Sequence, residues 1–181
     1  MVTHTRLESQ VPDDTARHLR QLAALLAYPG FDALAAVRGL RAVAGWPSAA
    51  ALDELIALPL ERWQAEHTRL FVNGYPSTPC FPFVADERGS AAALQDLYCR
   101  AGLFAAPELA GYLGTLLECA AYLLDARTLP EPPDPAVLVT LRDDYLTAWL
   151  PRFGAALQTH AALTLYRELG AALTAVPDRL R

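Results

Sequence analysis

Residues 107–126 read PELAGYLGTLLECAAYLLDA and contain the clearest helical pattern in the chain. At 100° per residue, five of their side chains fall within about 40° of one line along a helix. These five are Leu109, Leu113, Leu116, Ala120 and Leu123. Pro107 suits the first turn of a helix, because its missing N–H has no intrahelical partner there. The pattern predicts one helix from Pro107 to about Ala126 with its apolar side in a core, widened by Leu117, Leu124 and Tyr112.

The opposite side of this helix carries two carboxylates. Glu118 and Asp125 are seven residues apart, which places them nearly above one another. Gly111, Gly114 and Ala121 lie beside them in the helical projection. We interpret the pair as a shallow acidic strip into which another chain could place arginines. The alternative is an ordinary solvated helix face.

Helical spacing of leucines, interrupted by proline and glycine, extends over the rest of the chain. It predicts helices over residues 14–27, 32–44, 48–58, 60–71, 86–100, 136–150 and 152–176, with a break or kink at Pro151. There is no run of alternating β-branched residues and no fixed repeat. The sequence therefore predicts an all-α, single-domain helical bundle of about seven or eight helices.

Proline-rich segments divide the predicted domain. We expect residues 1–14 to form a flexible tail and 15–181 the domain, with a Pro-rich loop at 73–83 and a stiff Pro-rich linker at 129–135. The loop is unusually apolar, since it contains Tyr75, Cys80, Phe81 and Phe83. We expect it to pack on the helices or to meet a partner.

The overall composition excludes several classes of protein. The 181 residues carry a net charge of -5 and include no lysine, which argues against a general nucleic-acid binder and excludes a P-loop or Schiff-base lysine. The first residues have no apolar signal-peptide core, and no apolar run reaches the roughly 18 residues of a membrane span. We therefore expect a cytoplasmic protein without membrane insertion.

The chain contains three cysteines and four histidines, residue types that often build catalytic and metal sites. They form no metal-ligand spacing, so neither a metal nor a cofactor is predicted. Cys80 could act as a nucleophile if a histidine lay beside it, and His67 is the nearest in sequence. The simpler interpretation is a reduced thiol in a core or loop. A binding protein is favoured over an enzyme.

Residues 66–103 read EHTRLFVNGYPSTPCFPFVADERGSAAALQDLYCRAGL. This stretch resembles the TorD/DmsD/NarJ family of chaperones for molybdenum-containing redox enzymes, the redox enzyme maturation proteins. In that family a Leu-Phe pair leads to a glycine and a loop of the form P-x-x-P-aromatic-Glu-Ser. The matching positions are Leu70, Phe71, Gly74, Pro79, Pro82 and Phe83. The family's Glu-Ser falls on Val84 and Ala85, so Asp86 and Glu87 are the candidates for the acid.

A second family stretch, P-D-H-L-x-x-x-L-E, fits at Leu113, Leu117 and Glu118. Its Asp-His pair, which the family uses in binding the client's signal peptide, falls on Gly111 and Tyr112. The segment LLAYPG at 25–30 and the aromatic-rich C-terminal third also resemble the family.

The resemblance implies a non-enzymatic, all-α chaperone that binds an apo-molybdoenzyme catalytic subunit, possibly through its twin-arginine leader. It would assist cofactor insertion, complex assembly and proofreading before export, as a monomer or dimer. A structural or regulatory subunit of a redox complex and a small all-α enzyme using Cys80 remain the alternatives. The predicted client-binding residues are Phe71, Gly74, Pro79, Cys80, Phe81, Pro82, Phe83, Asp86, Glu87, Tyr112, Glu118 and Asp125.

Overall fold

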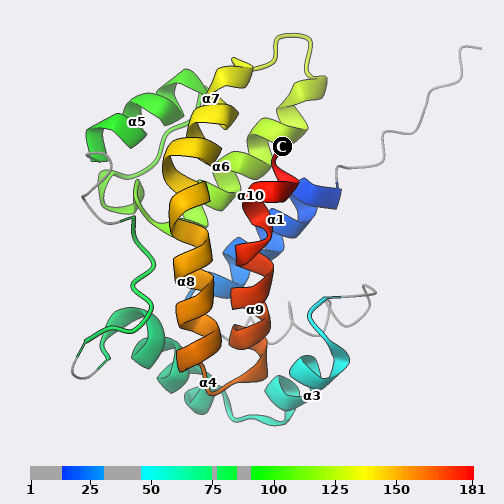
Figure 1. Ribbon diagram of the computed structural model, residues 1–181, viewed down its shortest axis with the longest axis vertical. Coiled ribbons are helices and arrows are strands. Elements are labelled where there is room, and N and C mark those ends of the chain that lie inside the picture. Colours follow the sequence, from blue (N-terminus) through cyan, green and yellow to red (C-terminus); the bar gives the residue numbers. More distant parts are fainter. Residues whose placement is uncertain (1–13, 31–45, 75–76, 85–90) are drawn as a thin grey trace, which may run out of the picture.

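The computed structural model describes residues 14–30, 46–74, 77–84 and 91–181 (Figure 1). These residues form α-helices with short 3₁₀ and π turns, and none of them belongs to a β-strand longer than an isolated bridge. The predicted all-α fold, with about the expected number of helices, is confirmed. The predicted tail up to residue 13, the predicted helix at 32–44 and the candidate residues Asp86 and Glu87 lie outside the described residues.

The first helices begin and end close to their predicted limits. Ser48 caps the second of them, because its hydroxyl accepts a hydrogen bond from the Ala51 N–H. The third continues without interruption into a π-helical turn. Their bounds are α1 Asp14–Leu26, α3 Ala49–Ala57, α4 Leu60–His67 and the π turn Thr68–Val72.

The second half of the chain contains the longer helices. Its elements are α5 Ala91–Arg100, a 3₁₀ turn Pro107–Leu109, α6 Leu113–Asp125, a 3₁₀ turn Ala126–Thr128, α7 Pro135–Thr140, a π turn Leu141–Leu146, α8 Thr147–His160, α9 Thr164–Thr174 and α10 Val176–Arg179.

Two helix pairs make up most of the bundle. Helices α8 and α9 lie antiparallel along the long axis, and α1 packs against α6 behind them (Figure 1). Helices α3 and α4 lie at one end, beside the α8–α9 turn, and α5, α6 and α7 lie at the other. Leucines from all of these pairs, such as Leu22, Leu116 and Leu169, are fully buried in one continuous core.

Helices α8 and α9 approach unusually closely at two glycines. A Cβ atom on Gly154 would collide with the Gly170 carbonyl oxygen, and one on Gly170 would lie 2.5 Å from the Gly154 carbonyl oxygen. Only glycine at both positions therefore permits this crossing.

The prediction of one helix over 107–126 is wrong at its start. A 3₁₀ turn comes first, Tyr112 is extended, and α6 begins at Leu113. The chain segment before α5 causes this break, because the Gly111 carbonyl accepts from the Val84 N–H (2.9 Å) and the Leu113 N–H donates to the Pro82 carbonyl (2.8 Å). Leu109 consequently lies outside the core and is 46% exposed. The other four residues of the predicted stripe are buried, as expected.

Of the predicted break or kink at Pro151, the break is wrong. Pro151 lies inside α8, on its exposed face, where it leaves one helical hydrogen bond unmade. The chain instead turns at residues 161–163, so that the predicted helix 152–176 becomes α8, α9 and α10.

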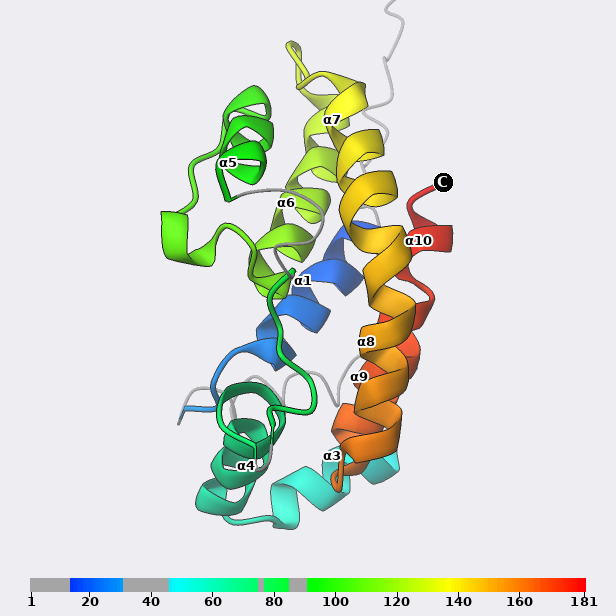
Figure 2. The same ribbon diagram turned by 60° about the vertical axis from the view of Figure 1, so that its left-hand side comes forward.

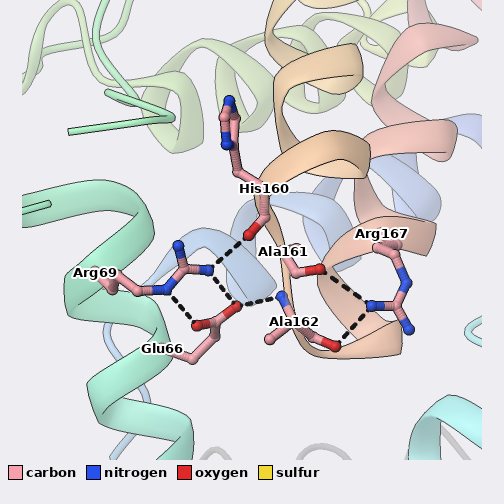
Figure 3. Close-up of polar contacts among 6 residues, drawn as sticks. All are labelled: Glu66, Arg69, His160, Ala161, Ala162 and Arg167. Atoms are coloured by element: carbon pink, nitrogen blue, oxygen red, sulfur yellow. Dashed lines mark hydrogen bonds and ion pairs between the residues drawn. The ribbon is translucent and has the colours of Figure 1, made fainter. Parts of the chain in front are cut away.

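Side chains of α3, of α4 and of the π turn that follows α4 hold this turn in place (Figure 3). The Glu66 carboxylate accepts from the Ala162 N–H at 2.6 Å, and Arg69 donates to the His160 carbonyl at 2.7 Å. Glu54 accepts from the Thr164 N–H at 2.8 Å. The α8–α9 turn thus depends on tertiary contacts. It contains no proline or glycine from which a turn could be predicted.

Candidate functional site

The Pro-rich loop is fixed by backbone hydrogen bonds at both of its ends. The Cys80 N–H donates to the Leu70 carbonyl in the π turn at 3.0 Å. The bonds of Pro82 and Val84 to the start of α6 and the isolated bridge between Phe83 and Tyr112 hold the other end. Residues 77–84 therefore run as a strap that is bonded to the π turn after α4 and to the start of α6 (Figure 2).

Several residues of the family motif shape this strap from within. Phe71, Cys80 and Pro82 are buried. A Cβ atom on Gly74 would lie 2.6 Å from both the Pro79 ring and the Ser77 carbonyl oxygen, so a larger residue would displace the loop. Phe71, Cys80 and Pro82 therefore position the loop from its buried side, and Gly74 permits its close approach to Pro79.

Three aromatic side chains lie next to one another where the strap meets α6, with Phe81 exposed and Phe83 and Tyr112 half-buried. Phe81 is 57% exposed, and its ring centroid lies 5.1 Å from that of Phe83, which in turn lies 5.4 Å from Tyr112. The Tyr112 hydroxyl donates to the Leu26 carbonyl at 2.8 Å and fixes its ring against α1. Burial raises the pKa of Tyr112 to about 12, so that it stays neutral. We call Phe81, Phe83 and Tyr112 the aromatic surface.

The same Leu26 carbonyl contacts a buried histidine. His67 Nε2 lies 3.0 Å from the Leu26 oxygen, and its ring packs edge-on against Phe71 with centroids 4.8 Å apart. Burial lowers the pKa of His67, although the Leu26 contact opposes the shift. The end of α1 is thus hydrogen-bonded to the end of α4 through His67 and to the start of α6 through Tyr112.

The two predicted carboxylates lie together, but the chain supplies a cation of its own. Arg20 of α1 places Nη2 2.6 Å from Asp125 and Nε 3.8 Å from Glu118. Gly114 is covered by the Tyr112 ring, and Ala121 is buried, so small residues do not open a groove beside the acids. The sequence indicated the acids, while Arg20, in a distant helix, gave no local signal.

A pocket between α5 and α6 was not predicted. It has a volume of about 350 Å³ and includes Leu103, Phe104 and Tyr122 in its lining, with Glu118 and Arg20 among the polar groups. Phe104 is 83% exposed. Its only sequence signal is an aromatic residue standing between Gly102 and Pro107, in a connection rather than in a helical pattern. We call this cavity the α5–α6 pocket.

The alternative of catalysis by Cys80 finds no support in the thiol's surroundings. Burial raises the pKa of Cys80 to about 11, with Arg69 opposing the shift, so the reactive thiolate is disfavoured. No cluster of histidine, cysteine and carboxylate side chains suitable for a metal occurs within the described ranges. Within the same ranges, no helix has the length and apolar character needed to cross a membrane.

The family described as nitrate reductase delta subunit matches residues 10–155, which include the Pro-rich loop, the aromatic surface and α6. The chain belongs to this family. The nitrate reductase delta family is one of NarJ/TorD-type chaperones, so the resemblance noted in the sequence is confirmed, as is the class of molybdoenzyme maturation chaperone. Such chaperones are not catalysts.

The fold of this delta-family chain is also found in a solved structure. A crystal structure of a proposed redox enzyme maturation protein from Archaeoglobus fulgidus is similar with a TM-score of 0.63 and 21% identity, over 88% of this chain and 91% of that one. No curated protein matches the chain significantly.

Proposed function

We propose that this protein binds the apo form of the catalytic subunit of a molybdenum oxidoreductase in the cytoplasm and keeps it competent for cofactor insertion. The proposal includes binding of the subunit's leader or body, assistance in assembly and proofreading before export. The family supplies the class of chaperone, and the surface of this chain supplies the reason for a polypeptide partner.

The aromatic surface is the observation that carries the proposal. A free monomer gains nothing from leaving Phe81 more than half exposed, since burying such a side chain contributes about 1.5–3 kcal/mol. The backbone bonds of the strap hold it in that position before any partner arrives. Aromatic side chains that are already ordered lose little entropy on binding and are frequent centres of protein interfaces.

The chemistry of the surface suits an immature subunit. An apo subunit exposes apolar segments that its cofactors and partner subunits later cover, and an aromatic surface can bind these reversibly. The net charge of -5 favours a client segment that is basic, such as a leader carrying arginines. Binding without turnover is expected, because no step of bond making is needed.

The test is binding of the purified apo catalytic subunit, prepared without molybdopterin, to the wild-type protein and to Phe81→Ser. We expect the substitution to weaken binding about tenfold, as loss of one exposed aromatic contact at an interface centre does. Val139→Ser is the matched control, because Val139 is another exposed apolar residue and lies on α7.

Two results would contradict the proposal. One is equal loss of affinity in the Phe81 and Val139 variants, which would remove the aromatic surface from the interface. The other is retention of this protein, in fixed stoichiometry, by the mature cofactor-loaded enzyme. That outcome would favour a structural subunit over a chaperone that leaves.

A further inference from the structure

We propose that the α5–α6 pocket is a second contact point for the partner polypeptide, which places a large apolar side chain in the pocket and an adjacent arginine or lysine on Glu118. Only the identity of the partner as the chaperone's client rests on the proposed function. The chemistry of the pocket is argued from its own residues.

The walls of the pocket are apolar even where their residues carry polar atoms. The Tyr98 hydroxyl donates to the Ala110 carbonyl at 2.6 Å, so its hydrogen is already used. Burial raises the pKa of Cys119 to about 12 and keeps the thiol neutral. Leu103, Ala105 and the Tyr122 ring complete a lining that favours an apolar group.

The pocket is built before any ligand binds. Gly102 adopts φ +73° and ends α5, and the Leu103 N–H donates to the Tyr98 carbonyl at 2.8 Å. Gln95 Nε2 donates to the Ala105 carbonyl at 2.7 Å. The backbone on both sides of Phe104 is therefore fixed, and the largely exposed Phe104 side chain lines the pocket at its rim. A preformed wall of this kind reduces the entropy lost on binding.

The volume of the pocket is large enough for one apolar side chain. A cavity of roughly 150 Å³ holds a benzene molecule. At about 350 Å³ the α5–α6 pocket has room for one phenylalanine or leucine side chain together with part of the ligand backbone. It lies at the lower limit of small-molecule sites, which begin at about 300 Å³.

Charge at the rim specifies the neighbour of that side chain. Glu118 is 53% exposed and only loosely paired, since its partner Arg20 is held 2.6 Å from Asp125 and 3.8 Å from Glu118. Asp125 thus keeps Arg20 aside, and Glu118 retains room for a cation from another chain. A ligand with a basic residue beside its apolar anchor matches this arrangement.

The test uses two small probes that do not depend on the client, N-acetyl-phenylalanyl-arginine amide and its phenylalanyl-glutamate counterpart. Binding is measured by saturation-transfer NMR at low salt, where exposed charges are least screened. We expect the arginine probe to bind at least about fivefold more tightly than the glutamate probe. Equal binding of the two would overturn the role of Glu118.

Four variants locate the binding. Thr115→Trp, which fills the pocket from α6, and Phe104→Ser, which removes its exposed wall, should each weaken the arginine probe about tenfold. Glu118→Gln should abolish the preference for arginine. Arg20→Gln should strengthen the arginine probe, because it removes the competing cation. Thr128→Trp, at an exposed position outside the pocket, is the control for the added indole.

Phe104→Ser changes only an exposed side chain, so it keeps the test valid if Thr115→Trp fails to fold. Unchanged affinity in Phe104→Ser would overturn the pocket assignment. Failure of the dipeptides to bind, with normal binding of the apo subunit, would remove the pocket and leave the chaperone function standing. Binding of the dipeptides without binding of the apo subunit would contradict the proposed function and leave the pocket assignment standing.

Discussion

Glu66 shows how much of the fold a single carboxylate can hold. Its oxygens accept from Arg69 Nε and Nη2, each at 2.8 Å, and from the Ala162 N–H at 2.6 Å, so α4 is joined to the α8–α9 turn (Figure 3). Burial raises its pKa, but the hydrogen bonds from Arg69 and Ala162 outweigh burial, and the net pKa is lowered.

Replacing this carboxylate should therefore cost stability. We expect Glu66→Gln to lower the free energy of unfolding by about 1–3 kcal/mol, because it leaves Arg69 and the turn with poorer acceptors. Urea denaturation at neutral pH measures the loss. Glu61→Gln, on the exposed side of the same helix, is the control.

The same residue predicts a pH effect of known sign. Since the folded pKa lies below the ordinary value of 4.5, the stabilisation is complete above that pH and is lost as the pH falls through the folded pKa. The difference in stability between the wild type and Glu66→Gln should shrink on acidification below pH 4.5. A constant difference down to the acid limit would argue against an ionised Glu66.

At the scale of helices, the crossing of α8 and α9 depends on a pair of glycines. Gly154→Ala places a methyl group against the Gly170 carbonyl and should destabilise the protein by about 1–3 kcal/mol, as overpacking does. Gly111→Ala is the matched control, because its nearest contact is an ordinary 3.7 Å to the Val84 carbonyl oxygen. Thermal denaturation of the two variants makes the comparison, and equal melting temperatures would contradict the close crossing.

The elements also show what sequence periodicity can and cannot reveal. It located α1, α3, α4 and the core side of α6, because leucine spacing and proline or glycine stops act within one helix. It missed the start of α6 and the turn at residues 161–163, because side chains and backbone from distant segments determine both.

The candidate site likewise has a part that the sequence predicted and a part that depends on contacts between distant segments. The aromatic loop and the two acids were visible as composition, and the family match includes them. Arg20 and the α5–α6 pocket were not visible, because they arise only when α1 and α5 are packed beside α6.

For the whole molecule, two histidines, buried His67 and half-buried His18, add a second pH window. Burial lowers the pKa of both His18 and His67 below the ordinary value of 6.5, and Arg179 adds to the shift of His18. The unfolded chain therefore binds protons more readily, and stability should fall as the pH drops below 6.5.

We expect the His67→Gln variant, which retains a donor for the Leu26 carbonyl, to lose stability less steeply than the wild type between about pH 7.5 and 5. His18 still titrates in this variant, so some slope should remain. Denaturant unfolding at several pH values tests this. Identical slopes in the two proteins would show that His67 is not the titrating group.

The close contact of α8 with α9 also bears on how the chain acquires its structure. These helices are neighbours in sequence, whereas α1 and α6 are joined across the chain, as in the Arg20–Asp125 pair. Loop closure is fast for near neighbours and slow for distant ones. We therefore expect the α8–α9 hairpin to belong to the folding nucleus, and Gly154→Ala to slow folding more than it speeds unfolding. The strap and the α1–α6 face, which carry the proposed partner contacts, would then assemble last on a nucleus made by the C-terminal part of the chain.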